Sequence, residues 1–443
     1  MSELKTVLGG YTSFYNIGFT LLLMTLIEKI RKKEVGLAVV GLGRVGLPLA
    51  LKFSSKGLRV VGVEKNDELR KKIERAESPF REEGMEILLR EEVGGGRFSV
   101  VSTLSQAKAE IILITVGTPL TRDLRPDLTH LYEVLHELRQ NPLKGKLIIL
   151  RSTVPPGTTR GIVAKYLQEK GEAFYLAYCP ERILEGKALK ELETLPEIVG
   201  GVDEESSEAA AELFRLLNPE KKILKTTPEV AELAKLFTNI YRYVNFALSN
   251  QLALISEHYG VDAYEVIRIA NEGYARSNIP LPGPAGGPCL YKDGYMLTYT
   301  PFIDFIKAAW HLNESIPSHL VGRVKKELGS LMGKKVALLG LAFKADSDDA
   351  RESPAVRLRD ALKAEGCEVH VHDPFLEPTP LEEVLSDAQV VVLAVNHTAF
   401  RKIKEEDLSR LAKPGCIVVD CWGWFDPEKV RKAGMRYIGL GRG

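Results

Sequence analysis

The sequence predicts an α/β protein in which two Rossmann-like, doubly wound domains are joined by a central domain built on a long helix. Short apolar runs alternate with charged, helix-forming stretches after about residue 35, and the same alternation returns in the last quarter of the chain. Between them, from Pro228 to about Gly329, the pattern is helical with almost no strand signal. We expect an N-terminal helical extension over 1–34 and domains over 35–225, 226–330 and 331–443.

The expected strands are short apolar runs, which are typical of strands buried on both faces of a parallel sheet. In the first α/β domain they are Gly36–Val40, Arg59–Val63, Ile111–Thr115 and Leu147–Leu150. In the second they are Val336–Leu339, Glu368–His372, Val390–Val395 and Ile417–Val419.

The composition is that of a globular protein with balanced charge. The 443 residues include 60 Lys and Arg against 59 Asp and Glu, which gives a formal charge of +1. The sequence therefore lacks the basic field of a nucleic-acid-binding protein, and we expect no nucleic acid partner. Five cysteines without paired spacing indicate reduced thiols and a cytoplasmic protein.

An apolar run, Ile17–Ile27, lies near the N-terminus. It is shorter than the roughly 20 apolar residues that a membrane span needs. Neither a basic cluster before it nor a small-residue cleavage site after it marks a signal peptide. We expect an appended amphipathic helix rather than a targeting segment, and no membrane association.

The first chemical motif is a glycine-rich turn between the first expected strand and a helix that begins near Leu47. Gly41, Gly43 and Gly46 have the GxGxxG spacing, which allows a tight turn, close approach to a pyrophosphate, and packing of helix on strand. Glu64 ends the next strand, where a carboxylate binds the ribose hydroxyls and repels a 2′-phosphate. The motif predicts NAD rather than NADP, with Lys65 as the feature that opposes this choice. The alternative is an ordinary turn beside a surface glutamate.

A segment dense in Gly and Pro, residues 282–288, comes immediately before Cys289, and Lys292 and Asp293 follow. Such a segment is irregular and brings its backbone close to another group. A neighbouring ammonium group favours the thiolate form of a cysteine, so Cys289 is a candidate nucleophile. The alternative is an inert core cysteine, which is how we interpret the other four. No cysteine spacing indicates a metal site.

On the expected helix Ala231–Glu257, Lys235, Asn239 and Arg242 fall on one face. They form either the solvent-exposed face of an amphipathic helix or a set of hydrogen-bond donors for an oxyanion.

Further polar residues follow strands of the first domain, where the nicotinamide is expected. Thr153 lies in one such segment, and Glu181 and Glu185 lie in another. The two glutamates are one turn apart if that segment is helical, so they are either a base and a binding group or a capping pair. In the second α/β domain, Lys344 follows a strand and is either a phosphate-binding cation or a solvated surface lysine.

Seven motifs in order resemble the UDP-glucose/GDP-mannose dehydrogenase family from about residue 36 to the end. They are GLGRVGLPLA, VGTP, STVPPGT, PERILEG, AELAKLFTN, GGPC with KD, and GLAFKADSDDARESPA. The resemblance implies NAD on the first domain, a UDP-sugar on the last, and a homodimer built on the long helix, with higher assembly open. It also implies oxidation of the sugar C6 alcohol to a carboxylate with two NAD.

The resemblance further implies individual roles. Cys289 attacks the aldehyde and carries a thiohemiacetal and then a thioester, Lys235 and Asn239 stabilise the oxyanion, and Asp293 assists deprotonation of the alcohol through a water. Thr153 and Glu181 position and activate the hydrolytic water. The implied cofactor contacts are Gly41, Gly43, Arg44, Val45, Gly46, Glu64, Thr118, Thr153 and Glu185. The implied substrate contacts are Glu181, Arg182, Glu185, Lys235, Asn239, Arg242, Arg276, Gly286, Gly287 and Lys344, with Arg276 reaching a neighbouring subunit.

The substrate is expected to be a UDP-N-acetylhexosamine, with UDP-N-acetyl-D-mannosamine favoured. Arg182 and the spacing of Asn239, Arg242 and Asn245 resemble that branch of the family. Glu185, Gln251 and Pro288 depart from it. UDP-glucose and UDP-N-acetylglucosamine remain alternatives. Rivals of other classes are a single-step NAD-dependent hydroxyacid dehydrogenase, which would not need Cys289, and a non-catalytic NAD sensor.

Overall fold

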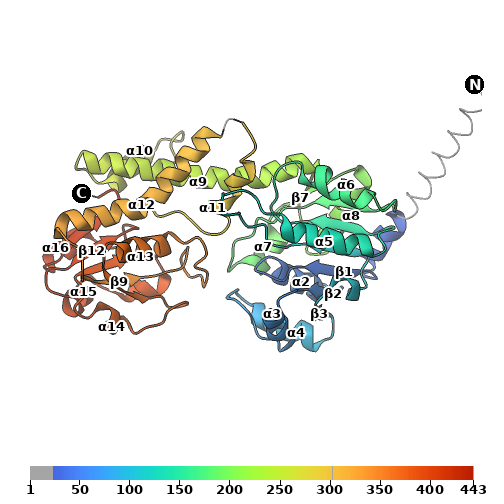
Figure 1. Ribbon diagram of the computed structural model, residues 1–443, viewed down its shortest axis with the longest axis horizontal. Helices are drawn as coiled ribbons and strands as arrows, with labels where there is room; N and C mark the ends of the chain where they lie inside the picture. The colour runs from blue at the N-terminus through green and yellow to red at the C-terminus, as the bar shows by residue number, and fades with distance from the viewer. Residues whose placement is uncertain (1–22, 302, 443) are drawn as a thin grey trace, which may run out of the picture. The chain divides into compact units, whose positions relative to one another are not determined.

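The computed structural model describes residues 23–301 and 303–442, and these form two compact units. The first unit runs to Phe237 and includes Tyr295–Leu297, whereas the second comprises Thr238–Gly294 and Thr298–Gly443. The boundary lies within one long helix, α9 (Pro228–His258). Each unit contains one sheet with helices around it (Figure 1).

The first unit alternates strands and helices up to the start of α9. Its strands are β1 (Gly36–Val40), β2 (Arg59–Val63), β3 (Phe98–Val101), β4 (Ile111–Ile114), β5 (Leu147–Leu150), β6 (Tyr175–Tyr178), β7 (Glu197–Gly201) and β8 (Ile223–Thr226). Its helices are α2 (Gly46–Ser55), α3 (Asp67–Glu74), α4 (Met85–Gly94), η1 (Leu104–Gln106), α5 (Thr129–Gln140), η2 (Thr159–Ala164), α6 (Lys165–Gln168), α7 (Ala188–Thr194) and α8 (Glu204–Arg215).

The first sheet has the order β3-β2-β1-β4-β5-β6-β7-β8 and is parallel except where β6 pairs with β7. Successive residues of β1 face opposite layers, because Leu37 and Val39 join one hydrophobic core while Ala38 and Val40 join the other. Helices therefore cover both faces, and the carboxyl ends of the parallel strands share one edge.

The second unit contains the rest of α9 and a smaller α/β domain. Its further helices are α10 (Ala263–Asn271), α11 (Leu290–Asp293), α12 (Asp304–Leu328), α13 (Pro354–Ala364), α14 (Leu381–Leu385), η4 (Thr398–Lys402), α15 (Glu405–Leu411) and α16 (Pro427–Lys432), and η3 (Gly294–Leu297) crosses the boundary. Its strands are β9 (Lys335–Leu339), β10 (Glu368–His372), β11 (Val390–Leu393), β12 (Ile417–Asp420) and β13 (Arg436–Gly439), in the parallel order β10-β9-β11-β12-β13.

The fold class predicted from the sequence is confirmed, and each of the eight expected strands is present within two residues of its expected bounds. The first sheet departs from parallel pairing at one place, where β7 runs antiparallel to β6. We did not name β3, β6, β7, β8 or β13 as strands. β7 begins with a glutamate and ends with two glycines, and β8 exposes two of its four residues, so neither has the pattern of a buried apolar strand.

The expected N-terminal amphipathic helix is present over residues 23–31, and the earlier part of that expectation, residues 1–22, lies outside the described residues. Leu26 and Ile30 enter the core of the first unit, and Arg31 pairs with Glu212 of α8 at 2.9 Å. The polar and apolar sides of the helix are therefore separated as the pattern predicted. Within the described part of the chain, no helix is long and apolar enough to cross a membrane.

Candidate active site

The turn after β1 gives each glycine of the first motif a separate physical reason. Gly41 has a φ of +91°, which side-chain-bearing residues rarely adopt. No atom lies within 4 Å of where a Cβ of Gly43 would be, so this position is open for a ligand. A Cβ on Gly46 would lie 1.9 Å from the Gly41 carbonyl oxygen. The start of α2 can therefore pack against the turn only because residue 46 is glycine. This cradle fits the pyrophosphate of a dinucleotide.

Glu64 lies at the end of β2 beside this turn. One carboxylate oxygen accepts a hydrogen bond from Leu42 N at 2.8 Å, and the other accepts one from Asn66 N at 2.9 Å. Lys65 points to a different pair of carboxylates, with its Nζ 3.2 Å from Glu133 and 3.4 Å from Glu137. Lys65 is therefore already neutralised, and it does not offset the negative charge that Glu64 presents to a 2′-phosphate.

The segments after β4 and β5 are joined by side-chain hydrogen bonds. Thr118 Oγ1 donates to the Thr153 carbonyl oxygen at 2.6 Å, and Ser152 Oγ donates to the Val116 carbonyl oxygen at 2.7 Å. The structure thus brings together two residues, Thr118 and Thr153, that the family resemblance assigns to cofactor binding. Beside the glycine turn, Arg44 lies 3.9 Å from Glu185.

A buried arginine holds Glu181. Arg151 donates from Nε and Nη2 to one oxygen of Glu181 at 2.9 and 2.8 Å, and from Nη1 to Glu197 at 2.7 Å. The second oxygen of Glu181 accepts from the backbone N–H groups of Arg182 and Ile183 at 2.7 and 3.0 Å. These four hydrogen bonds fix the position of the carboxylate group.

The helical turn considered for Glu181 and Glu185 is absent. Residues 181–184 have no regular secondary structure, and α7 begins only at Ala188. Glu181 satisfies the two following amides with its own side chain, which stabilises a loop in place of a helix. The guanidinium group of Arg182 donates to the Pro196 carbonyl oxygen and so attaches this loop to the start of β7.

Glu232 attaches α9 to the loop that carries Thr153. This fully buried carboxylate accepts from Gly157 N at 2.6 Å, Thr159 N at 2.8 Å and Thr159 Oγ1 at 2.6 Å. Sequence reasoning missed Glu232, because a single glutamate on a helix carries no signal of distant amide partners.

Two residues of the polar face of α9 are buried. Lys235 is 8% exposed and Asn239 is 5% exposed, so these two are not on the wet side of an amphipathic helix. Asn239 Nδ2 donates to Asp293 Oδ2 at 2.6 Å, which joins α9 to the short helix after Cys289. The structure does not bring Arg242 to this pair, since Arg242 is exposed.

The Gly/Pro-rich segment packs on the second sheet's domain through its glycines. A Cβ would meet the Trp422 ring at 2.6 Å on Gly283, Pro354 at 2.5 Å on Gly286, and the Phe343 ring at 2.4 Å on Gly287. Asn250 of α9 holds the segment further, with its amide bonded to both the N–H and the carbonyl of Gly283 at 2.9 and 3.1 Å. Trp422 and Phe343 follow the carboxyl ends of β12 and β9, so the segment lies at the ligand-binding edge of that sheet.

Cys289 is exposed at the start of α11, whereas the other four cysteines are buried. Burial raises the pKa of each buried thiol, to about 11 for Cys416, and Glu197 adds to the effect at Cys179. The remaining two buried thiols are Cys367 and Cys421. At neutral pH these four are protonated and enclosed, so Cys289 is the accessible thiol of the five.

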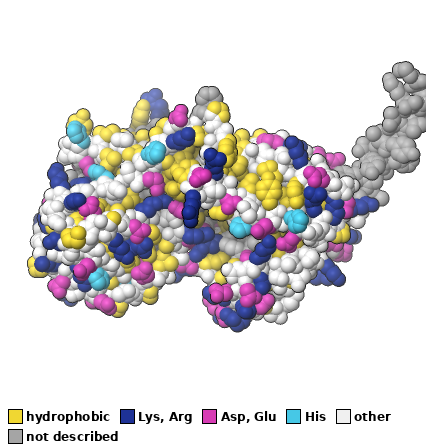
Figure 2. Space-filling view, viewed as in Figure 1, with side chains coloured by type: hydrophobic (Ala, Val, Ile, Leu, Met, Phe, Trp, Pro, Cys, Tyr) yellow, Lys and Arg dark blue, Asp and Glu magenta, His cyan; other side chains and the backbone are white. Residues whose placement is uncertain are grey.

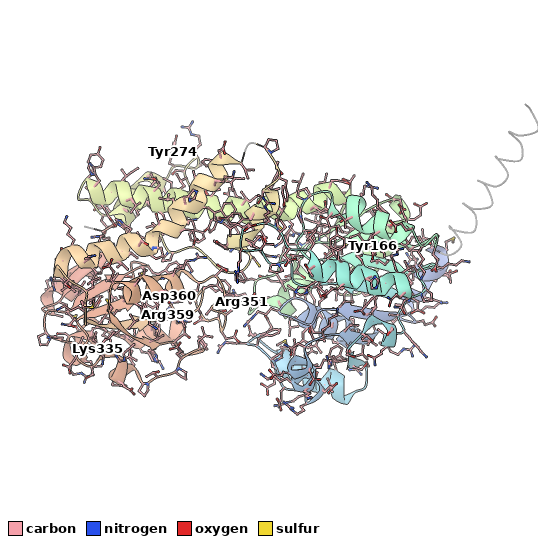
Figure 3. All side chains as sticks on the ribbon, viewed as in Figure 1. Tyr166, Tyr274, Lys335, Arg351, Arg359 and Asp360 are labelled. Atoms are coloured by element: carbon pink, nitrogen blue, oxygen red, sulfur yellow. The ribbon has the colours of Figure 1, made fainter. Side chains whose placement is uncertain are left out.

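The segment after β9 carries Lys344 and begins with Gly340, whose φ of +91° matches that of Gly41. Lys344 is half-buried, with its Nζ 5.7 Å from the centre of the Phe343 ring. Arg351, labelled in Figure 3, belongs to the same segment and pairs with Asp349 at 2.5 Å. Arg276 lies elsewhere: it is exposed and its guanidinium stacks on the Tyr274 ring at 4.8 Å.

Family models match the chain in three consecutive parts. The NAD binding domain of the UDP-glucose/GDP-mannose dehydrogenase family matches residues 35–218, the central domain residues 229–314, and the UDP binding domain residues 337–427.

Individual proteins match nearly the whole chain. The UDP-N-acetyl-D-mannosamine dehydrogenase of Methanocaldococcus jannaschii is 34% identical over 429 residues, covering 94% of this chain and 99% of that protein. The structure of UDP-D-ManNAc dehydrogenase from Pyrococcus horikoshii is 33% identical with a TM-score of 0.86, covering 92% and 99%. That of NDP-N-acetyl-D-galactosaminuronic acid dehydrogenase from Methanosarcina mazei is 31% identical with a TM-score of 0.77, covering 94% and 98%.

Iodoacetamide is expected to modify Cys289 alone in the native protein at neutral pH, because the other four thiols are buried with raised pKa values. Peptide mass spectrometry after brief labelling checks this. Cys289→Ser should abolish labelling, and the urea-unfolded protein should label at all five cysteines. Native labelling of Cys179 or Cys416 would contradict the assignment.

Proposed function

Because the chain belongs to the UDP-glucose/GDP-mannose dehydrogenase family, we propose that it oxidises UDP-N-acetyl-D-mannosamine to UDP-N-acetyl-D-mannosaminuronate, with Cys289 as the nucleophile. The family and its NAD binding domain make the protein an NAD-dependent oxidoreductase that acts on a nucleotide sugar. The observation that carries the finer proposal is the exposed Cys289 in a segment that packs beside the second sheet's ligand-binding edge and bonds to α9 through Asp293 and Asn239.

NAD, when bound, accepts a hydride from the sugar C6 in each of two oxidations. In the first, the hydroxyl proton leaves through a water held by Asp293, and the product is the aldehyde. The Cys289 sulfur then bonds to C6, giving a thiohemiacetal whose second hydride loss leaves a thioester. Water cleaves the C–S bond, which releases the carboxylate and returns the thiol. Lys235 and Asn239 supply the donors for the oxygen that becomes negative.

NAD is held by the turn after β1 in this proposal. The cradle of Gly41, Gly43 and Gly46 receives the pyrophosphate, and Glu64 receives the ribose hydroxyls once the Leu42 and Asn66 N–H groups have oriented its carboxylate.

The N-acetylhexosamine is supported by two observations. Relatives named for N-acetyl-D-mannosamine and for N-acetyl-D-galactosaminuronic acid both cover nearly the whole chain. In addition, the residues around Arg182 and Asn239 resemble that branch of the family. The alternative within the family is UDP-glucose. A single-step hydroxyacid dehydrogenase has no need of the accessible thiol at Cys289.

Assayed with a panel of nucleotide sugars, the protein should release NADH fastest with UDP-N-acetyl-D-mannosamine and should yield two NADH for each sugar consumed, with little free aldehyde. The panel includes UDP-glucose, UDP-N-acetylglucosamine and GDP-mannose, and NADH is followed by absorbance to completion. One NADH per sugar would contradict the thioester route, and a preference for UDP-glucose would contradict the substrate.

Substituting Glu181 tests its role in thioester hydrolysis. With Glu181→Gln we expect a burst approaching two NADH per active site, then turnover slowed by about 10²–10⁴-fold, because general-base assistance is worth roughly that factor. Intact mass should show the sugar acyl group on Cys289. Since two of the four hydrogen bonds to Glu181 come from Arg151, which also binds Glu197, Glu197→Gln is the matched control: it perturbs Arg151 and leaves Glu181.

If Glu197→Gln reproduces the burst and the slow turnover, the effect belongs to the ion cluster and Glu181 is not the base. Cys289→Ser serves as the second comparison. It should bind substrate but show no acyl adduct and no burst, because serine cannot form the thioester. An acyl adduct at a residue other than 289 in that variant would exclude Cys289 as the nucleophile.

We propose a homodimer built on α9 and α10. These helices expose apolar side chains that a water-facing helix normally lacks, at 44–74% exposure over both helices and the turn between them. On α9 their spacings of seven and four residues form one stripe. Yellow side chains over these helices are visible in Figure 2. Tyr274, which follows the end of α10, is labelled in Figure 3 and marks this side of the molecule. The residues are Val230, Phe237, Tyr241, Leu248, Ile255, Tyr259, Val261, Val266 and Ile269.

Light scattering at micromolar concentration should give twice the mass of one chain. Leu248→Glu should shift the protein toward the monomer, because a charge would be buried in the interface. Met332→Glu is the control, since Met332 is an exposed apolar residue outside α9 and α10. A monomeric parent protein would contradict the proposed dimer.

We place the enzyme in the cytoplasm. Five free thiols fit a reducing compartment.

A further inference from the structure

The segment that follows β9 holds a strained backbone close to Lys344. Asp346 has a φ of +56°, in the left-handed region that residues with a side chain rarely adopt. Its carboxylate accepts from Thr398 N at 2.9 Å and from Thr398 Oγ1 at 2.6 Å. Its backbone N–H donates to His397 Nδ1 at 2.9 Å. The loop after β11 thus fixes the conformation of Asp346 through hydrogen bonds to both the side chain and the backbone of that residue.

His397 is fully buried and its tautomer is fixed by its partners. A backbone N–H can only donate, so Nδ1 carries the lone pair and Nε2 carries the proton. Nε2 donates to Asp373 Oδ2 at 3.1 Å. The rings of Phe375 and Phe400 both lie 5.3 Å from the imidazole centre at steep angles, and they leave it one orientation.

Asp373 holds the other end of the same segment. The oxygen that accepts from His397 also accepts from Leu341 N at 2.7 Å and Ala342 N at 3.1 Å, the first amides after Gly340. Although burial alone would raise it, the hydrogen bonds from His397 and the backbone hold the pKa of Asp373 below its usual range. A charged carboxylate and a neutral imidazole therefore fix residues 341–342 and 346, and Lys344 lies between them.

We propose that His397 is a positioning residue for nucleotide-sugar binding: by accepting from Asp346 N, it fixes the backbone from which Lys344 reaches the diphosphate. This rests on the proposed function, together with the substrate contact that the family resemblance implies for Lys344. A lysine is a flexible point charge, so its contribution to binding depends on a fixed backbone. His397 touches neither substrate nor NAD in this account.

Two substitutions separate the two nitrogens of His397. Asn retains an acceptor near the Nδ1 position and loses the donor to Asp373, whereas Gln retains a donor near the Nε2 position and loses the acceptor for Asp346. Titration of the full-length protein with UDP should give a Kd about tenfold higher for His397→Gln, since one hydrogen bond is worth about that factor. His397→Asn should recover most of the affinity.

Three further readouts separate positioning from general loss of structure. The KM for the nucleotide sugar should rise in His397→Gln while the KM for NAD and kcat stay near the parent values. Amide exchange should quicken in residues 341–349 and stay unchanged in β9 and β11. His370→Gln, at an exposed histidine of β10, is the control and should match the parent in every readout.

Equal loss of UDP affinity in the Asn and Gln variants would overturn the proposal, because the acceptor would then not matter. Faster exchange throughout the second sheet would also overturn it and assign His397 to core stability. A parent protein that binds no UDP contradicts the proposed function itself, whereas a parent that binds UDP with an unaffected His397→Gln contradicts only the role of His397.

Discussion

A carboxylate at the end of one strand accepts a hydrogen bond from the turn after the neighbouring strand, and this interaction occurs in both sheets. In the first sheet Glu64 accepts from Leu42 N at 2.8 Å; in the second Asp373 accepts from Leu341 N at 2.7 Å. Both turns begin with a glycine at a φ of +91°. The first turn stays open at Gly43, whereas Asp373 is buried and takes a further amide and His397. The same carboxylate-to-turn hydrogen bond therefore shapes an open glycine turn in the first domain and fixes the segment that carries Lys344 in the second.

A second constraint on the site is that the Gly/Pro-rich segment must pack closely on the last domain through its glycines. Each of Gly283, Gly286 and Gly287 lies against a ring or a proline of the last domain, so any side chain there would push the segment away. The same segment leads into Cys289, and Asp293 four residues later bonds to Asn239. The position of Cys289 thus depends on close backbone packing at one end and on one amide–carboxylate bond at the other.

Local patterns in the sequence were sufficient for eight parallel strands, the long helix and the glycine turn, because their signals lie within a few residues. They were not sufficient where a distant partner decides. β7 begins with Glu197, whose buried carboxylate pairs with Arg151, 46 residues earlier, and with Lys221. The same arginine holds Glu181 in a loop where the spacing allowed a helix. Glu232 and His397 were missed for this reason, since their partners come from other elements.

The division of binding between the two domains is the central claim, and calorimetric titration of Gly46→Ala with NAD and with UDP tests it most directly. An added Cβ at Gly46 would lie 1.9 Å from the Gly41 carbonyl oxygen, so the cradle must deform. We expect the variant to lose NAD binding and to bind UDP with the parent Kd, while Gly94→Ala, at an open position of α4, binds both normally. Loss of UDP binding together with NAD, or unchanged NAD binding, would contradict the account.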